Sequence, residues 1–217
     1  MTTLVRKTTT ADALISRFDH WLRGVHPGAD ATGPRPNPAA DLPEARLSEP
    51  ERREVAGLMR VNHAGEVCAQ ALYLGQAMTA RRPSLHEHML KAAAEEADHL
   101  NWCATRLQEL NDHTSYLNLL WYLGSYAIGS VAGLSGDRWS LGFVAETERQ
   151  VEQHLEGHRR RLPAIDRRSR AIVEQMQLDE ARHGRNAMEA GGSELPLPVC
   201  LGMRLAAKVM TTTAHWI

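Results

Sequence analysis

The segment LDEARHG (178–184) decides the fold, because it places Glu180 and His183 three residues apart in a stretch with helical periodicity. Residues three and four apart share one face of an α-helix. A single Glu-x-x-His is weak evidence in a chain with 11 histidines. A second copy, EEADHL (95–100), contains Glu96 and His99, so the neighbours of both pairs decide whether they form a site.

Both pairs lie on apolar helix faces. A buried carboxylate is costly unless it is paired or coordinated. Two such pairs that point into one interior therefore predict a bound cation. The neighbours at helical spacing are mostly apolar: Met89, Ala93 and Leu100 for Glu96, and Val173 and Met176 for Glu180.

Two further glutamates also lie on helix faces without charged neighbours. Glu66 and Glu148 have apolar or uncharged neighbours at helical spacing, whereas Glu146 faces Arg149. Glu152, one turn beyond Glu148, abuts charged side chains and is the second choice. We therefore predict that Glu66 and Glu148 also point inward.

The spacing of the four inward glutamates indicates an internal duplication. Glu96 follows Glu66 by 30 residues and Glu180 follows Glu148 by 32, in each case one helix and a turn. One glutamate from each of two helices and a Glu-x-x-His from each of the other two is the ligand set of ferritin-like di-iron or di-manganese bundles.

Two divalent cations would cancel the charge of four carboxylates. Hard oxygen ligands with one imidazole per metal favour iron or manganese over copper, and zinc would leave the redox capacity of such a site unused.

Helix signals place these residues on four helices. SEPE (48–51) reads as a capping box that opens a helix running to Pro83, and SLHE (84–87) repeats the signal and opens a second helix. A third helix begins near Asp137 and ends before Pro163, and a fourth runs to Gly191. No window shows sustained strand-like alternation. The sequence predicts an all-α, ferritin-like four-helix bundle with additional amphipathic or apolar helices.

The additional helices flank or interrupt this bundle. We expect an amphipathic helix in residues 1–26, a Pro-rich linker in 27–47 and the metal-binding domain in 48–217. That domain includes an apolar segment, 114–136, without a charged residue, and an amphipathic C-terminal helix, 199–214. Glycines and serines make 114–136 a poor membrane span. Periodicity alone leaves two interpretations open, packing on the bundle and contact with a membrane.

Composition narrows the class of protein. A net charge of −1 with interspersed signs gives no electrostatic footprint for nucleic acid. Cys68, Cys103 and Cys200 form no Cys-x-x-Cys, so neither a disulfide framework nor a thiolate zinc site is indicated. The N-terminus lacks the pattern of a secretory signal, and we expect a cytoplasmic location.

Other polar residues near the predicted site receive plainer interpretations. Tyr73 is interpreted as packing. Asp98 and Asp179 fall to the side of the inward helix face, although metal-bound imidazoles commonly need such partners. Lone histidines are usually core or surface residues, which is the interpretation for His63, His154 and His158.

Three motifs carry a resemblance to a known family. RVNHAGEVCAQALYLGQ (60–76), EEADHLNW (95–102) and DEARHG (179–184) resemble the bacterial demethoxyubiquinone hydroxylases, di-iron monooxygenases of ubiquinone biosynthesis. The resemblance covers roughly 47–217, and NHAGE (62–66) is more specific than Glu-x-x-His alone. The family pattern implies the same metal ligands as the helix phases: Glu66, Glu96, His99, Glu148, Glu180 and His183.

The resemblance also implies an activity. It implies two iron ions per chain, O2 as co-substrate, electrons from NADH or a reduced quinol, and hydroxylation of a polyprenylated methoxy-methyl-benzoquinol ring. The expected partners are this quinol, the membrane surface and other proteins of ubiquinone biosynthesis, with a peripheral location on the cytoplasmic face of the inner membrane. The alternatives are ferritin-like iron oxidation or peroxide reduction, and a bundle with a structural metal.

Overall fold

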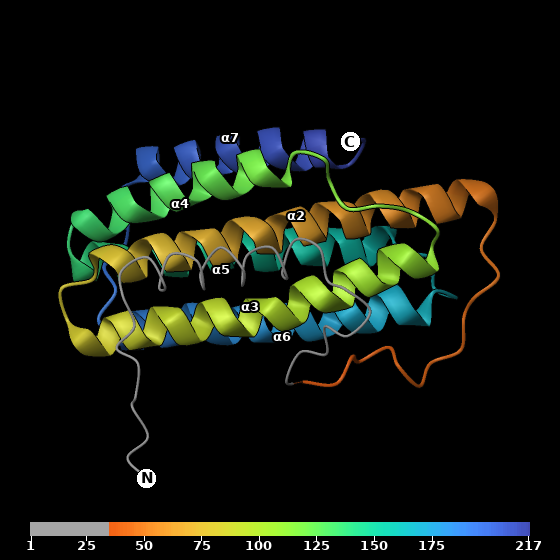
Figure 1. Cartoon of the computed structure of the whole chain (residues 1–217), viewed down its shortest axis with the longest axis horizontal. Helices are drawn as coiled ribbons and strands as arrows, with labels where there is room; N and C mark the ends of the chain where they lie inside the picture. The colour runs from red at the N-terminus through yellow and green to blue at the C-terminus, as the bar shows by residue number, and fades with distance from the viewer. Residues whose placement is uncertain (1–34) are drawn as a thin grey trace, which may run out of the picture.

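The computed structural model describes residues 35–217, so the helix predicted in 1–26 lies outside the described residues. Every regular element in the described part of the chain is helical, which confirms the all-α prediction. The helices are α2 (Glu49–Thr79), α3 (Pro83–Glu109), α4 (Asn118–Leu134), α5 (Asp137–Arg161), α6 (Arg167–Glu189) and α7 (Leu197–Ala214) (Figure 1).

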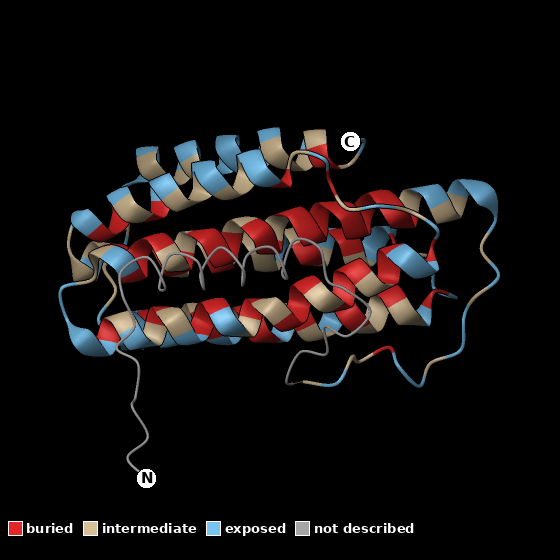
Figure 2. Cartoon of the chain, in the orientation of Figure 1, coloured by how far each residue is buried: buried red, intermediate tan, exposed pale blue. Residues whose placement is uncertain are grey.

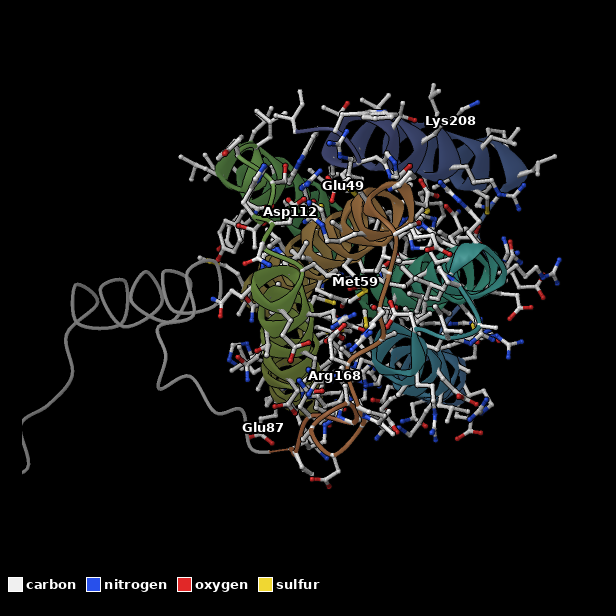
Figure 3. The ribbon with its side chains drawn as sticks, turned by 90° about the vertical axis from the view of Figure 1, so that its right-hand side faces the viewer. Glu49, Met59, Glu87, Asp112, Arg168 and Lys208 are labelled. Atoms are coloured by element: carbon white, nitrogen blue, oxygen red, sulfur yellow. The ribbon has the colours of Figure 1, made fainter. Side chains whose placement is uncertain are left out.

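The six helices lie in three layers of two. Figure 1 shows α4 and α7 above, α2 and α5 in the middle, and α3 and α6 below. Seen along the helix axes, α2, α3, α5 and α6 form a four-helix bundle, and α4 and α7 cover its α2/α5 side (Figure 3). The predicted ferritin-like bundle with additional helices is therefore the observed architecture.

Local sequence explains most of the helix ends. The backbone N–H of Ser48 donates to Glu51 Oε2 (2.8 Å), so the first predicted capping box is present. The second predicted box is wrong: α3 begins at Pro83, with Arg82 in an extended conformation at the cap position and no side-chain cap. Proline suits the first helical position, because its missing N–H would have no partner there.

The apolar core of the bundle is divided into two main clusters along its length. One cluster includes Leu58, Trp102 and Met176, and the other includes Met89 and Leu141. On each bundle helix, the predicted site residues lie in the sequence between the parts that build the two clusters. The polar site thus sits mid-bundle with apolar packing on both sides.

Helix α4 packs very closely on α2. A Cβ atom at Gly129 would lie 2.3 Å from the Leu72 carbonyl oxygen, and one at Gly75 would lie 2.4 Å from the Tyr126 carbonyl oxygen. Only glycine permits such an approach between two backbones. The apolar segment predicted in 114–136 is therefore packed on the bundle by its glycine-bearing side.

The outer side of the α4/α7 layer is apolar and exposed (Figure 2). Among the described helices, none combines the length and the apolarity needed to cross a bilayer. The exposed large apolar side chains of this layer are Leu119, Leu120, Leu123, Ile128, Val131 and Leu134 on α4, and Leu197, Leu201, Leu205 and Val209 on α7.

The segment 35–47, called the strap below, contacts the bundle before α2 begins. It passes along the α3/α6 layer and then rises to the start of α2 (Figure 1). Ala39 is buried in the first apolar cluster, and the Glu44 carboxylate accepts two hydrogen bonds from the Arg106 guanidinium (2.6 and 3.0 Å). This part of the predicted Pro-rich linker is therefore docked on the bundle.

Candidate metal centre

The structure brings all six predicted ligands together. None of them is more than 7% exposed. Each faces the bundle interior because its helical spacing places it in line with the apolar core positions of its own helix. Glu66 lies on α2, Glu96 and His99 on α3, Glu148 on α5, and Glu180 and His183 on α6.

The six side chains form two adjoining groups. In the first, ligand atoms of Glu66, Glu96, His99 and Glu180 lie within 4.8 Å of one another, and in the second the same holds for Glu148, Glu180 and His183. Glu180 belongs to both groups. Glu96 Oε1 also lies 3.4 Å from His183 Nδ1. Two neighbouring cation positions with shared carboxylates fit this arrangement.

The first group contains more acceptors than the protein can satisfy. His99 Nδ1 lies 3.0 Å from Glu96 Oε2, 3.1 Å from Glu180 Oε1 and 3.5 Å from Glu66 Oε2. One ring nitrogen carries at most one proton, so it cannot serve three carboxylates. Glu96 Oε1 and Glu180 Oε1 are buried without a hydrogen-bond partner. These donor atoms fit a cation, which would satisfy several oxygens at once.

Burial and charge shift the pKa values of the ligand side chains in different directions. Burial opposes a charged Glu96, but the neighbouring histidines outweigh it and lower its pKa. Burial, and then neighbouring carboxylates, raise the pKa of Glu66 and Glu148 well above the usual range. Burial opposes a charged His183, but the nearby carboxylates of Glu180 and Glu96 outweigh it and raise its pKa to about 12. The raised pKa values of Glu66 and Glu148 show that buried carboxylates at this position require nearby positive charge to be ionised, which a bound cation would supply.

The outer ring nitrogen of each ligand histidine contacts a carboxylate from the helix of the other Glu-x-x-His pair. His99 Nε2 lies 3.1 Å from Asp179 Oδ2, and His183 Nε2 lies 2.8 Å from Glu95 Oε2. Such a contact fixes the proton on Nε2 and leaves the Nδ1 lone pair free for a metal. From its helix phase, Asp179 is expected to lie to the side of the site without a role in it. This expectation is wrong, because that side of α6 faces His99 on α3.

The sequence contains a signal for these contacts that helix phase did not reveal. An acid directly precedes the glutamate of each Glu-x-x-His pair, in EEADH (95–99) and DEARH (179–183). The duplication therefore includes the acid, and each one reaches across to the other pair's histidine. Asp98 has a different role, because its carboxylate accepts from Arg35 Nε (2.8 Å).

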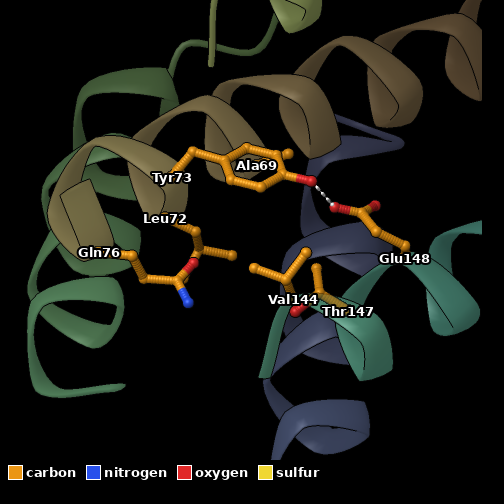
Figure 4. A pocket seen from close by; sticks show the side chains of 7 residues that line it. All are labelled: Ala69, Leu72, Tyr73, Gln76, Val144, Thr147 and Glu148. Atoms are coloured by element: carbon orange, nitrogen blue, oxygen red, sulfur yellow. Dashed lines mark hydrogen bonds between the residues drawn. The ribbon is translucent and has the colours of Figure 1, made fainter. Parts of the chain in front are cut away.

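Tyr73 does more than pack. Its hydroxyl donates a hydrogen bond to Glu148 Oε1 (Figure 4), and its ring meets His183 edge-on at 6.5 Å between centroids. Tyr73 also lines a narrow cleft between α2 and α5 that reaches Glu148. The other residues of this cleft are Ala69, Leu72, Gln76, Val144 and Thr147.

A second, polar opening lies on the α3/α6 side of the centre. It is a cavity of about 170 Å³, and Tyr73 and His183 form part of its wall. Tyr73 and Val144 line both the polar cavity and the cleft between α2 and α5. The other residues of the polar cavity are His88, Lys91, Ala92, Glu95, Arg182 and Asn186.

Comparison with known proteins identifies the family. A family model described as ubiquinone biosynthesis protein COQ7 matches residues 53–214, which include all six predicted ligands. The chain belongs to the COQ7 family. The strap, with Arg35, lies before the part of the chain that the COQ7 model matches.

Curated COQ7-type relatives agree with this assignment. A protein of Nitrosospira multiformis is 56% identical over 206 residues, covering 95% of this chain and 98% of the relative. A protein of Acinetobacter baumannii is 55% identical over 213 residues (98% and 100%), and one of Ralstonia pickettii is 57% identical over 215 residues (95% and 99%). All three are named 3-demethoxyubiquinol 3-hydroxylase. The predicted resemblance and the expectation of an enzyme are confirmed.

The three histidines interpreted from the sequence as core or surface residues, His63, His154 and His158, do not join the centre. His158 Nδ1 and Asn62 Oδ1 lie 2.7 Å apart, and the rings of His154 and His158 are 3.9 Å apart. Burial lowers the pKa of His158 to about 2 and that of His154 to about 4. Neither they nor the fully buried His63 belongs to the two metal-binding groups found among the described residues.

Proposed function

We propose that this protein hydroxylates the ring of demethoxyubiquinol, a polyprenylated methoxy-methyl-benzoquinol, with O2 as co-substrate. The observation that carries the proposal is the pair of adjoining carboxylate and imidazole groups beside a cleft between α2 and α5. The names of the curated relatives support the same reaction.

Two iron ions per chain would be held by the six buried side chains of these groups: Glu66, Glu96, His99, Glu148, Glu180 and His183. Hard oxygen donors with one imidazole for each ion suit iron, which when bound supplies the reduction of O2 and the transfer of one oxygen atom to the ring. The second oxygen atom leaves as water with two electrons, from NADH or a reduced quinol, and two protons.

The chain itself orients these ligands and excludes water. Asp179 and Glu95 hold the Nε2–H of His99 and His183, so that both Nδ1 atoms face the interior. Tyr73 holds Glu148 by its hydroxyl, at the inner end of the cleft. The apolar clusters on both sides keep the carboxylates in a dry environment, where their attraction for a cation is strong.

The substrate's approach follows from the layers. A polyprenyl tail is confined to the bilayer, and the cleft lies between α2 and α5, the two helices that α4 and α7 cover. The exposed apolar side chains of that layer support peripheral binding to a membrane surface. We propose that this surface rests on the cytoplasmic face of the inner membrane, where other proteins of ubiquinone biosynthesis would also be available as partners.

The test uses a strain that lacks this protein. Under air it should accumulate the demethoxy quinone and lose ubiquinone, as measured by mass spectrometry. The unaltered gene should restore ubiquinone, whereas Glu180→Ala or His183→Ala should not. Oxygen-18 gas should label the new ring hydroxyl, and labelled water should not. A normal quinone pool with altered handling of iron or peroxide would instead support the ferritin-like alternative.

A further inference from the structure

One arginine of the strap reaches the outer side of the metal centre. Arg35 Nε donates to Asp98 Oδ2 (2.8 Å) and Arg35 Nη1 donates to Asp179 Oδ2 (2.7 Å). The guanidinium also lies 4.9 Å above the Trp102 ring, and Nη2 is 3.2 Å from His99 Nε2. A single planar fork therefore joins α3 to α6 directly behind one histidine.

Arg35 acts on His99 through Asp179. When His99 binds a metal by Nδ1, its Nε2 carries the proton and donates to Asp179, so Nε2 cannot also accept from Arg35. Arg35 instead fixes the Asp179 oxygen that receives the imidazole proton. Arg182 holds the other oxygen of Asp179 (2.9 Å) from the same helix, but its contact with Glu95 on α3 is longer (3.4 Å), so Arg35 makes the shorter bridge between α6 and α3.

Other residues of the strap also contact the bundle, and these contacts hold Arg35 in position. Ala39 is 2% exposed within the first apolar cluster. Glu44 binds Arg106, a guanidinium with a fully buried side chain, by two hydrogen bonds. These contacts fix the strap within its turn (38–41) and after it, four and nine residues after Arg35.

The other histidine lacks an equivalent clamp in the described part of the chain. Glu95, which holds His183, has a side chain 24% exposed, and its cationic neighbours are more distant: Arg182 at 3.4 Å and Lys91 at 3.9 Å. His183 also borders the 170 Å³ polar cavity. The two halves of a duplicated site are therefore unequal on their outer sides.

We propose that Arg35 is a positioning residue that makes the metal bound at His99 the more tightly held of the two. The proposal rests on the proposed di-iron centre. The His99 position is closed by the strap, and the His183 position exchanges with solvent through the polar cavity. Residues before the family-matched region thus help to determine the metal affinity of the centre.

The test follows iron release. The full-length protein, loaded anaerobically with ferrous iron, is mixed with the chelator ferrozine, and release is recorded over time. The unaltered protein should lose one iron quickly and one slowly. Arg35→Ala should accelerate only the slow phase, by up to about tenfold, because Asp179 remains and the full effect belongs to loss of the histidine's direct partner. Glu95→Gln should accelerate only the fast phase.

Two control variants make the result interpretable. Arg35→Lys keeps the charge but cannot bridge two carboxylates, so it should also accelerate the slow phase. If circular dichroism shows that Arg35→Ala is unfolded, the release rate of Arg35→Lys is the test of the proposal. Arg53→Ala, an exposed arginine paired with Glu49, should change neither phase. Failure of the unaltered protein to bind two irons would overturn the proposed function. Two irons that leave at one rate, or a slow phase that is the same in the Arg35 variants, would overturn this inference alone.

Discussion

At the scale of single residues, two glutamates on α5 test the ligand assignment directly. Glu148 is 2% exposed and bonded to Tyr73, whereas Glu146 accepts from Arg149 (2.8 Å) on the outside of the bundle. Glu148→Ala should lower the iron content from about two to about one per chain, because it removes a ligand from one position. Glu146→Ala should retain both irons. Iron analysis of the purified variants measures this, and equal loss from both would contradict the assignment.

A second residue-scale prediction concerns acid stability. Burial lowers the pKa of His158 from 6.5 to about 2, so the folded state keeps this imidazole neutral while the unfolded chain binds a proton. The free energy of unfolding should therefore fall as the pH drops below 6.5, by about 1.4 kcal/mol per pH unit from this group. His158→Gln should remove that part of the slope between pH 6.5 and 4.

Urea unfolding at several pH values, on iron-loaded protein, measures the difference between His158→Gln and the unaltered chain. The contribution of the metal is common to both proteins and largely cancels. The two stability curves should converge as the pH falls. Parallel curves would show that His158 is protonated in the folded state.

The six central residues could be predicted because each one follows the apolar period of its own helix. The residues behind them could not be found in that way. Asp179 lies to the side of the inward face of α6, and its contact with His99 depends on how α6 is rotated against α3. Arg35 is 64 residues from His99 in the sequence, in a segment without helical period. Such contacts exist only in the assembled bundle.

At the scale of helices, the α4/α2 contact offers a matched pair of glycines. A Cβ atom at Gly129 would lie 2.3 Å from a backbone oxygen of α2, whereas one at Gly124 would meet nothing within 4 Å. Gly129→Ala should lower the free energy of unfolding by about 1–3 kcal/mol, because two backbones must separate. Gly124→Ala should raise it by up to about 1 kcal/mol through helix propensity.

Thermal melting distinguishes the two glycine variants. For a chain of this size, 1 kcal/mol corresponds to a shift of about 2–4 °C. The melting temperature of Gly129→Ala should fall and that of Gly124→Ala should not. If both fell by the same amount, the close packing of α4 on α2 would be incorrect.

The helices themselves were predictable to within a few residues, and the misses have local causes. The first predicted helix ends at Thr79 instead of continuing to Pro83, because Pro83 opens the next helix. From the sequence, the glycines of 114–136 indicate only that this segment is a poor membrane span. Whether these glycines permit close helix packing depends on which helix lies against them, and the sequence alone does not show this.

At the scale of the whole molecule, the proposed function requires one surface to face the lipid. The α4/α7 layer carries the exposed apolar side chains and covers the two helices that line the cleft to Glu148. The opposite α3/α6 layer carries the polar cavity and the strap. This polarity orients the molecule: the quinol ring would enter from the lipid side, and water and metal ions would exchange from the other.

Membrane binding by α7 tests this orientation. Leu201 and Leu205 are 51% and 65% exposed, and Ala214 is the one fully buried residue of α7, so charges at these leucines should leave the bundle folded. Each buried leucine contributes about 1.5–3 kcal/mol. Leu201→Glu/Leu205→Glu should therefore reduce co-sedimentation with phospholipid vesicles at least tenfold. Leu178→Glu, at an equally exposed position on α6 (63%), should bind like the unaltered protein. If the α6 variant lost binding and the α7 variant kept it, the α3/α6 layer would be the membrane face, and the proposed entry of the quinol through the cleft between α2 and α5 would be wrong.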